Sequence, residues 1–147
     1  MSNRKTVPFE TTLHVRDTCL CLHLQRAARV VARRFDDALR PVGITQGQFS
    51  LLMSLNRPEP PTIGSVAALL AMDRTTLTAN LKPLERRGLV TVTVDESDRR
   101  SRHLALTAEG RALLVAAVPV WKRTHAALER KLKRGGDALR AELMALS

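Results

Sequence analysis

The hydrophobic period of this chain changes from that of a helix to that of a strand just after Gly88, and that change limits the folds available to it. Between residues 62 and 87, apolar residues recur every three or four positions, which is the pattern of helices. Downstream, Val90, Val92 and Val94 alternate with threonines, which is the pattern of a half-buried strand. A charged turn over 95–100 and a short second strand over 103–106 follow. Two short helices and a hairpin in this order predict a helix-turn-helix with a wing.

Residue types at the helix ends place the boundaries of these two helices. Thr62 and Asp73 are N-cap residue types, and each stands directly before an apolar-periodic segment. Gly88 stands where a left-handed residue ends a helix. We therefore expect a short helix after Thr62 and a second helix from Asp73 to Arg87.

Longer helices are predicted on both sides of this segment. The first, over 18–39, carries a stripe at helical spacing: Leu20, Leu24, Ala28, Val31, Phe35 and Leu39. Pro41 and Gly43 end it, and Thr45 caps a shorter helix that stops before the proline-rich loop 56–61.

The C-terminal part is also predicted to be helical. A helix from Thr107 to Arg134 is expected to bend at Pro119 and to end at the Gly135-Gly136 pair. Asp137 is expected to cap a last helix, whose apolar face is Leu139, Leu143 and Leu146.

The fold class that follows is mainly α with a small β-hairpin: a winged helix-turn-helix with long terminal helices. The 147 residues suit one domain, so we treat 1–147 as a single unit. Within it, 45–106 is the predicted DNA-binding part, and 10–44 with 107–147 is the predicted dimerisation part. Because the apolar stripes exceed what one small winged domain can cover, a homodimer is expected.

The net charge of the chain limits the kinds of partner that it is expected to bind. Lys and Arg total 24 against 14 Asp and Glu, which gives a formal net charge of +10. Such an excess favours a nucleic acid or an anionic membrane surface. No run of apolar residues is long enough to span a bilayer, and residues 1–9 lack the apolar core of a signal peptide. We expect a cytoplasmic protein, and the charge alone does not choose between these two kinds of partner.

Motifs that carry catalysis or hold cofactors are absent from the sequence. There is no glycine-rich phosphate loop, no HExxH and no GxSxG, and paired CxxC motifs for a metal are missing as well. The chain has no Tyr and one Trp, so no aromatic platform for single strands is visible. We expect neither an enzyme nor a cofactor or metal, and double-stranded DNA as the ligand.

The helix from Asp73 to Arg87 has the composition of a DNA-recognition helix. Leu77, Leu81 and Leu84 fall on one side, and small, hydroxylated and cationic residues cover the rest. Arg suits guanine, Asn suits adenine, and Thr suits a thymine methyl group or a phosphate. The alternative is an ordinary solvated helix face. The predicted contacts are Arg74, Thr75, Thr76, Thr78, Asn80, Lys82 and Arg86.

The turn of the hairpin is the second predicted contact. Three arginines within four positions could reach phosphates and enter an adjacent minor groove. Asp98 is expected to pair with an arginine and hold its guanidinium in place, although a polar hairpin tip is the simpler interpretation. The predicted wing contacts are Asp98, Arg99, Arg100 and Arg102.

Three runs of sequence, in this order and spacing, resemble the MarR family of winged-helix regulators. They are Met72-Asp73-Arg74-Thr75-Thr76-Leu77-Thr78, then Leu84-Glu85-Arg86-Arg87-Gly88-Leu89-Val90, then Asp98-Arg99-Arg100-Ser101-Arg102 followed by Leu106-Thr107-Ala108-Glu109-Gly110. The resemblance implies an obligate homodimer formed by the terminal helices, with a recognition helix in the major groove. It also implies that Arg100 enters the minor groove and is placed there by Asp98.

The two cysteines leave alternatives open. On one helix, the sulfurs of Cys19 and Cys21 would point to opposite sides, which disfavours a disulfide between them. The position of Cys21 resembles that of the sensing cysteine in OhrR-type peroxide sensors, although Gln25 and Phe35 stand where those sensors have tyrosines. The interpretations are a buried structural cysteine, a redox-sensing Cys21 or, with His14 and His23, a metal site.

The resemblance also implies a small aromatic or anionic effector, bound between the dimer helices and the winged part. Phe35, Phe49, Met53, Trp121 and His125 are candidates to line that space, with Arg16 or Arg26 for a carboxylate. The alternative for each of them is an ordinary core or surface residue. The predicted function is a sequence-specific, homodimeric transcriptional regulator, a ligand-relieved repressor on a palindromic operator. The alternatives are a thiol- or peroxide-responsive repressor that uses Cys21, and a non-specific architectural DNA-binding protein.

Overall fold

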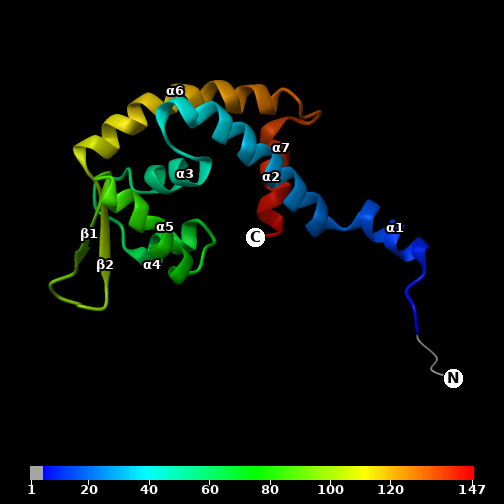
Figure 1. Cartoon of the computed structure of the whole chain (residues 1–147), viewed down its shortest axis with the longest axis horizontal. Helices are drawn as coiled ribbons and strands as arrows, with labels where there is room; N and C mark the ends of the chain where they lie inside the picture. Colours follow the sequence, from blue (N-terminus) through cyan, green and yellow to red (C-terminus); the bar gives the residue numbers. More distant parts are fainter. Residues whose placement is uncertain (1–4) are drawn as a thin grey trace.

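The structure is a computed structural model that describes residues 5–147. Its elements follow the order α1 (Phe9–Thr18), α2 (Leu20–Leu39), a 3-10 turn η1 (Arg40–Val42), α3 (Gln46–Ser54), α4 (Ile63–Leu69), α5 (Arg74–Arg86), β1 (Val90–Val94), β2 (Arg102–Leu106), α6 (Ala108–Glu129) and α7 (Gly135–Ala145). The shorter helices and the hairpin gather below α6, while α1 and part of α2 extend away from them (Figure 1). This arrangement is mainly α with one antiparallel hairpin, and it confirms the predicted fold class.

The first long helix differs from the sequence-based expectation. The sequence predicts one helix from Thr18, whereas the structure has two helices that are separated at Cys19. The backbone of Cys19 is extended, and its sulfur accepts a hydrogen bond from the amide of Leu22 at 3.5 Å, as an N-cap does. Periodicity does not reveal α1 because α1 buries no residue against this chain.

The caps of the winged part form as predicted. Thr45, Thr62 and Asp73 each accept a backbone N–H three residues further on, and so begin α3, α4 and α5. Gly88 follows α5 with a φ of +72°, the left-handed conformation that ends the helix. The strands pair in register from Val90 opposite Leu106 to Val94 opposite Arg102, so β2 begins one residue earlier than predicted.

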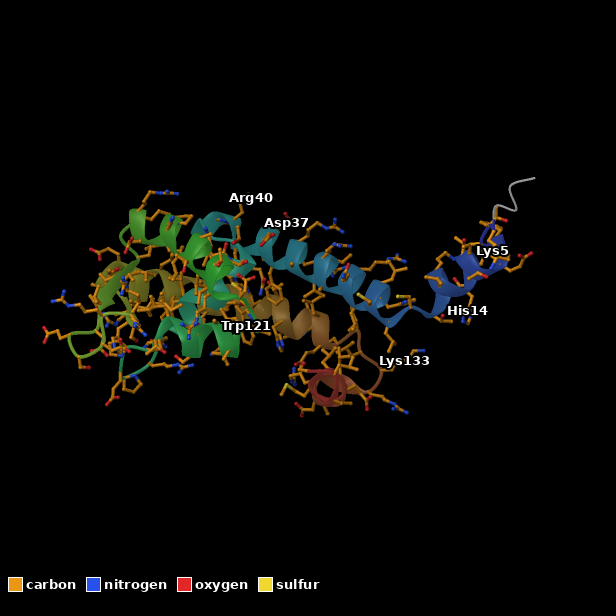
Figure 2. The ribbon with its side chains drawn as sticks, turned by 90° about the horizontal axis from the view of Figure 1, so that it is seen from below. Lys5, His14, Asp37, Arg40, Trp121 and Lys133 are labelled. Atoms are coloured by element: carbon orange, nitrogen blue, oxygen red, sulfur yellow. The ribbon has the colours of Figure 1, made fainter. Side chains whose placement is uncertain are left out.

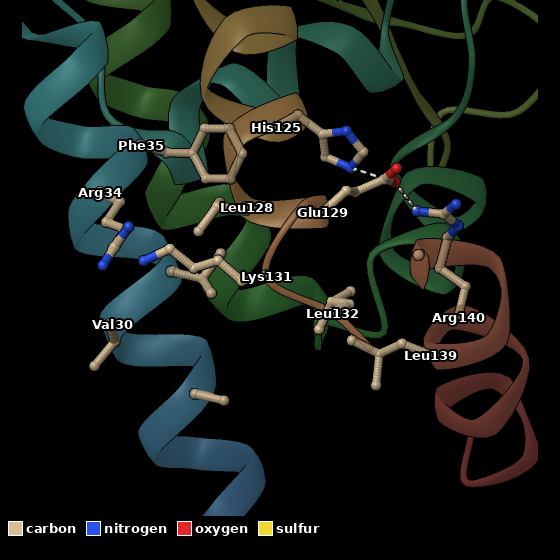
Figure 3. Close-up of a pocket in the computed structure, with 13 residues that line it drawn as sticks. Val30, Arg34, Phe35, His125, Leu128, Glu129, Lys131, Leu132, Leu139 and Arg140 are labelled. Atoms are coloured by element: carbon tan, nitrogen blue, oxygen red, sulfur yellow. Dashed lines mark hydrogen bonds and ion pairs between the residues drawn. The ribbon is translucent and has the colours of Figure 1, made fainter. Parts of the chain in front are cut away.

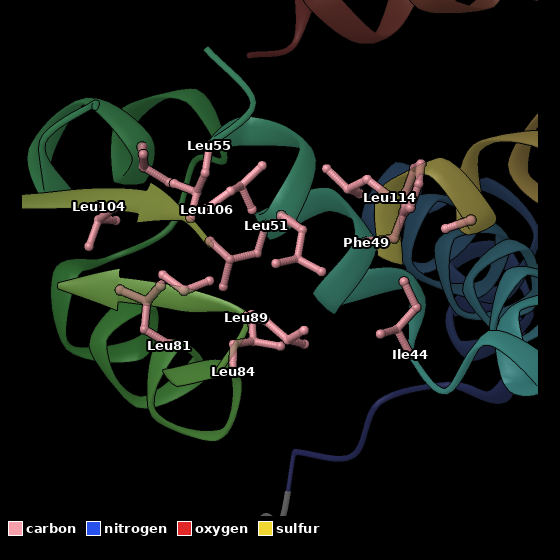
Figure 4. Close-up of a cluster of buried hydrophobic side chains, with 14 of the residues drawn as sticks. Ile44, Phe49, Leu51, Leu55, Leu81, Leu84, Leu89, Leu104, Leu106 and Leu114 are labelled. Carbon is pink, nitrogen blue, oxygen red and sulfur yellow. The ribbon is translucent and has the colours of Figure 1, made fainter. Parts of the chain in front are cut away.

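One apolar core joins the winged part to α6. Leu84 of α5, Leu104 of β2 and Leu114 of α6 are buried in a single cluster (Figure 4). The hairpin is also tied to the segment before α4, because the amide of Leu104 donates to the carbonyl of Pro61 at 2.9 Å. This core fixes the direction of α5 relative to the wing.

The C-terminal helices begin and end at other residues than predicted. α6 runs through Pro119, curves as Figure 1 shows, and ends at Glu129 rather than at Arg134. α7 begins at Gly135, and its N-cap residue makes no side-chain cap bond. Asp137, the predicted cap, lies inside the first turn and pairs with Arg140 at 2.6 Å, because a carboxylate can also accept from a cation one turn on.

The terminal helices present apolar side chains that this chain does not cover. Of the predicted stripe on α2, only Phe35 and Leu39 are buried, whereas Leu20 is 67% exposed. The predicted face of α7 is also largely exposed. Figure 2 shows α1 and the first half of α2 projecting beyond the packed part of the molecule. Among the described residues, no helix is both long and apolar enough to cross a membrane.

Candidate nucleic-acid interface

α5 presents the predicted surface to solvent. Its inner side is fixed by Leu77, Leu81 and Leu84, which are all buried. All seven residues predicted to contact DNA from this helix are exposed: Arg74, Thr75, Thr76, Thr78, Asn80, Lys82 and Arg86. A shallow depression runs along the outer side between Thr75, Thr78, Ala79 and Lys82. The exposed face is therefore small, hydroxylated and cationic, as a major-groove helix requires.

Two residues of that set are already engaged within the protein. The carboxylate of Asp73 accepts from the backbone N–H of Thr76 at 2.7 Å and from its hydroxyl at 2.9 Å. These bonds lower the pKa of Asp73, because they stabilise its ionised form. The side-chain amide of Asn80 lies 3.7 Å from the sulfur of Met72. The hydroxyl proton of Thr76 is therefore committed to Asp73, whereas Asn80 keeps a second amide N–H and its oxygen free of this contact.

The wing turn is built from carboxylates that accept backbone N–H groups. Asp98 accepts from the backbone N–H of Arg100 at 3.0 Å, and its carbonyl accepts from the N–H of Ser101 at 2.9 Å. The expected pairing of Asp98 with an arginine side chain is thus replaced by a bond to the Arg100 backbone. One nitrogen of Arg102 donates to the carbonyl of Arg99 at 2.7 Å, so Arg102 also braces the turn.

A second carboxylate holds the base of the wing. Asp95 accepts from the backbone and hydroxyl of Ser97 at 2.9 and 2.8 Å, and it lies 3.0 Å from Nε2 of His103. The other ring nitrogen of His103 faces the carbonyl of Pro60 at 3.4 Å. These partners raise the pKa of His103, chiefly through Asp95, and the bond to His103 lowers the pKa of Asp95. His103, which the sequence pattern does not single out, therefore links the wing to the loop before α4.

α5 and the wing face each other across one groove. The groove has a volume of about 360 Å³, and its walls come from α4, α5 and the wing turn. Its lining residues are Thr62, Ile63, Gly64, Arg74, Thr78, Asp98, Arg100, Ser101 and Arg102. Residues that are far apart in the sequence thus form one polar surface with three arginines and one aspartate.

Cys21 is exposed, so the interpretation of a buried structural cysteine is wrong for it within this chain. The side-chain amide of Gln25 lies 3.3 Å from the sulfur of Cys21, and Arg29 donates to the oxygen of Gln25 at 3.1 Å. Cys19 is half-buried at the break between α1 and α2. Within residues 5–147, no three His, Cys, Asp or Glu side chains gather as a metal site would need.

The residues predicted to line one effector space are divided between two cavities. A cavity of about 560 Å³ lies between α3, α4 and α6 and is lined by Phe49, Met53 and Trp121, with Lys122 as its cation. The ring of Trp121 stacks on Phe49, with centroids 6.2 Å apart.

Phe35 and His125 line a different cavity of about 440 Å³ between α2, α6 and α7 (Figure 3). Arg34, Lys131 and Arg140 surround this second cavity, and Arg140 pairs with Glu129 at 2.7 Å. Arg16 and Arg26 line neither cavity, and Arg16 pairs with its neighbour Asp17. The side chains of both arginines are exposed, so neither is placed on an effector cavity as predicted.

The fold, the exposed face of α5 and the wing together define a winged helix-turn-helix DNA-binding protein. Residues 44–101 match the model of the MarR family. The organic hydroperoxide resistance transcriptional regulator of Bacillus subtilis is 33% identical over 101 residues, which is 69% of each chain. This chain therefore belongs to the MarR family and is a DNA-binding transcriptional regulator, not an enzyme.

Solved structures of regulators agree with this assignment. The transcriptional regulator MosR of M. tuberculosis in complex with DNA is 37% identical, with a TM-score of 0.81, over 88% of this chain and 93% of that one. The repressor CouR bound to a DNA duplex is 32% identical, with a TM-score of 0.75, over 97% and 96% of the two chains. A second structure, of CouR from Rhodococcus jostii bound to p-coumaroyl-CoA, is 27% identical over 88% of this chain, with a TM-score of 0.71.

Proposed function

We propose that this regulator is a homodimeric repressor that binds a palindromic operator through α5 and the wing and is released by a small ligand. The observation that carries the proposal is the common groove, because it places the recognition helix and the wing arginines on one surface. A helix in the major groove and a hairpin in the adjacent minor groove then contact one half-site together. Such a regulator acts on the chromosome, in the cytoplasm.

The dimer is supported by the uncovered faces of the terminal helices. Leu20 and Leu24 of α2 and Leu139, Leu143 and Leu146 of α7 are all exposed in the single chain. A second copy would bury these side chains, and each buried Leu is worth about 1.5–3 kcal/mol relative to exposure. An isologous two-fold interface of this kind would place two α5 helices on the two halves of an inverted repeat.

Ligand release is supported by the cavity between α3, α4 and α6. Its apolar wall of Phe49, Met53 and Trp121 with Lys122 beside it suits an aromatic acid or another apolar anion. α4 packs on α5, so a ligand that wedges between α3, α4 and α6 would move α5 relative to the dimer helices. CouR, which binds p-coumaroyl-CoA, is a relative for which a ligand is known.

Selection of duplexes from a random pool by the purified protein tests the DNA-binding proposal. We expect an inverted repeat with half-site centres about 10 base pairs apart. Fluorescence anisotropy at one fixed salt concentration then compares the selected duplex with a scrambled duplex. A ratio of affinities of about 10³ or more supports a sequence-specific regulator. Equal affinities would identify a non-specific architectural protein instead.

A second candidate function, redox regulation through Cys21, is favoured by the contact of Gln25 with its sulfur. The exposed Cys21 thiol is open to solvent, and the Gln25 amide, itself bonded to Arg29, is placed to donate to a thiolate. An organic hydroperoxide would be reduced to the alcohol as the Cys21 thiolate becomes a sulfenic acid.

Treatment of the protein with an organic hydroperoxide before the anisotropy titration tests this candidate. Loss of operator binding in the wild type and in Cys19→Ser, but not in Cys21→Ser, would support it. Retention of binding by the oxidised wild type, with Cys21 shown to be modified by mass spectrometry, would reject it.

A further inference from the structure

We propose that the groove between α5 and the wing holds one phosphate group of the DNA backbone between Arg74 and Arg100, and that Gly64 provides the space for Arg74. This inference rests on the proposed binding of DNA. It assigns Arg74 to the backbone rather than to a guanine. It also gives a positioning role to Gly64, a residue of α4 outside the recognition helix.

The position of the Arg74 side chain is the first observation. Arg74 is the first residue of α5, and its guanidinium lies over Gly64 of the preceding helix. A Cβ atom placed on Gly64 would lie 2.7 Å from Nη2 of Arg74 and 3.5 Å from its Cζ. The guanidinium therefore reaches back from α5 into the groove, and only a residue without a side chain leaves it that room.

The charge of the groove is the second observation. Arg74, Arg100 and Arg102 face it with a single acid, Asp98, which gives a net charge of +2. Asp98 binds the backbone of Arg100 and not its guanidinium. Among the described residues, neither Arg74 nor Arg100 has a carboxylate within ion-pair distance. Two guanidinium groups without a counterion on one groove indicate an anionic ligand with several acceptor oxygens.

The geometry of a duplex identifies that ligand as a backbone phosphate. One sugar–phosphate strand separates the major groove from the adjacent minor groove. If α5 enters the major groove and the wing enters the minor groove, this strand must cross the space between them. That space is the groove of about 360 Å³, which Thr78 and Ser101 also line. A phosphate there would lie between the two guanidinium groups, with two hydroxyl-bearing residues beside it.

Substitutions at Gly64 and Arg74 test the assignment. Arg74→Ala should weaken binding to the operator and to a scrambled duplex by the same factor and reduce the salt slope by about one, as loss of a phosphate contact does. Gly64→Ala should weaken both in the same way while its thermal unfolding stays close to that of the wild type, because only a flexible guanidinium must move. In the double variant, Gly64→Ala should cause no loss of DNA affinity beyond that caused by Arg74→Ala. Gly47→Ala is the matched control, because Gly47 is exposed and its new Cβ would make only an ordinary contact, 4.0 Å from Oγ1 of Thr45.

Neutral methylphosphonate linkages provide a test that uses the unaltered protein. In each half-site, one linkage should weaken binding by the wild type when it is neutral. Neutralising the same linkage should weaken binding by Arg74→Ala by a smaller factor, because only Arg100 of the two arginines still contacts that phosphate. A change of base preference in Arg74→Ala, or no single sensitive linkage, would overturn the assignment. Unchanged binding by Gly64→Ala would overturn its positioning role.

Inorganic phosphate distinguishes a backbone phosphate from a free anion. It should not displace the duplex more than chloride does at the same ionic strength, and stronger displacement would make the groove a site for a free anion. If the wild type bound no duplex at all, the proposed function itself would fail. That result differs from every outcome above, because all of them require binding by the wild type.

Discussion

His103 and Asp95 pair across the base of the wing, with Nε2 of the imidazole 3.0 Å from a carboxylate oxygen. Both ring nitrogens of His103 face oxygen acceptors, Asp95 on the wing and Pro60 on the loop before α4. An imidazole with two acceptors is best satisfied when it carries both protons. Protonated His103 therefore joins the wing to the body of the winged domain.

This pair predicts a pH dependence of the wing. The pKa of His103 is raised above 6.5, so its contribution to stability is complete below pH 6.5 and is lost as the pH rises through the raised value. The pKa of Asp95 is lowered below 3.8, so its contribution is present above pH 3.8 and is lost as the pH falls through the lowered value. Both contributions are complete between these two limits. Protection of the wing amides from exchange, measured relative to their intrinsic exchange rate at each pH, should be greatest there.

An NMR titration of the imidazole protons checks the cause. Asp95→Asn should lower the pKa of His103 towards its ordinary value, because it removes the charge that stabilises the imidazolium ion. Asp98→Asn is the matched control, since Asp98 lies on the same hairpin and does not contact His103. A His103 pKa that stays raised in Asp95→Asn would mean that another group stabilises its proton.

Removal of the Asp98 carboxylate should weaken operator binding although it makes the net charge of the surface more positive. Asp98→Ala removes the acceptor for the Arg100 backbone, so the turn no longer holds Arg100 in place. Asp98→Asn keeps an acceptor oxygen and loses the negative charge, so it should bind at least as tightly as the wild type. Anisotropy titrations of both variants show whether the placement of Arg100 or the net charge of the surface has the larger effect on affinity. Tighter binding by Asp98→Ala would show that the net charge dominates.

Lys82 and Asn80 should differ in the kind of affinity that they supply. Lys82→Ala should weaken all duplexes alike and reduce the salt slope by about one, as expected for a phosphate contact. Asn80→Ala should relax base preference, with a loss on the order of 1–3 kcal/mol if a paired contact to adenine is removed. Titrations against single-base variants of the selected operator make this comparison. The same pattern for both variants would show that the faces of α5 are assigned wrongly.

A charge on the uncovered stripe of α2 should separate the proposed dimer. Leu24→Glu and Val31→Glu place a carboxylate where a second copy would bury an apolar side chain, and an unpaired buried charge strongly opposes association. Light scattering should report a dimer for the wild type and a monomer for these variants. Val94→Glu, on an exposed apolar residue of the wing, should stay dimeric. A wild type that is monomeric at micromolar concentration would contradict the proposed assembly.

Gly110 should be the glycine that tolerates substitution least. A Cβ on Gly110 would overlap the backbone carbonyl of Leu89, where α6 meets the start of the hairpin. Because backbone atoms cannot move aside as a flexible side chain does, Gly110→Ala should destabilise the fold by about 1–3 kcal/mol. Gly47→Ala, in an exposed turn of α3, should be neutral or stabilise by up to about 1 kcal/mol. Thermal unfolding measures both.

Local signals explain how much of this fold was predictable from the sequence. The caps at Thr45, Thr62 and Asp73 and the alternation of Val90, Val92 and Val94 act over a few residues, so the winged part was predicted nearly residue by residue. Likewise, Leu77, Leu81 and Leu84 define the inner face of α5 because helical spacing alone brings them together.

The terminal helices were predicted less well, because their apolar faces have no partner within this chain. α1 buries no side chain, so its sequence carries no strong periodic stripe of apolar residues. The break between α1 and α2 lies at Cys19, and no proline or glycine in the sequence indicates it. At the other end, Asp137 has the residue type of a cap, but the chain reverses at Gly135 and the helix has already begun when Asp137 is reached.

Contacts between distant segments were decided only by the tertiary structure. His103 and Pro60 are 43 positions apart, and Gly64 meets the Arg74 guanidinium across the turn between two helices. Such pairs depend on the packing of a shared core and on the direction of long side chains, which no local pattern encodes. By itself the sequence determined which helix exposes the proposed DNA-binding face and which turn forms the wing. The tertiary structure alone decided that Asp98 holds the Arg100 backbone and that α5 and the wing enclose one groove, because both depend on how the hairpin docks beside α4.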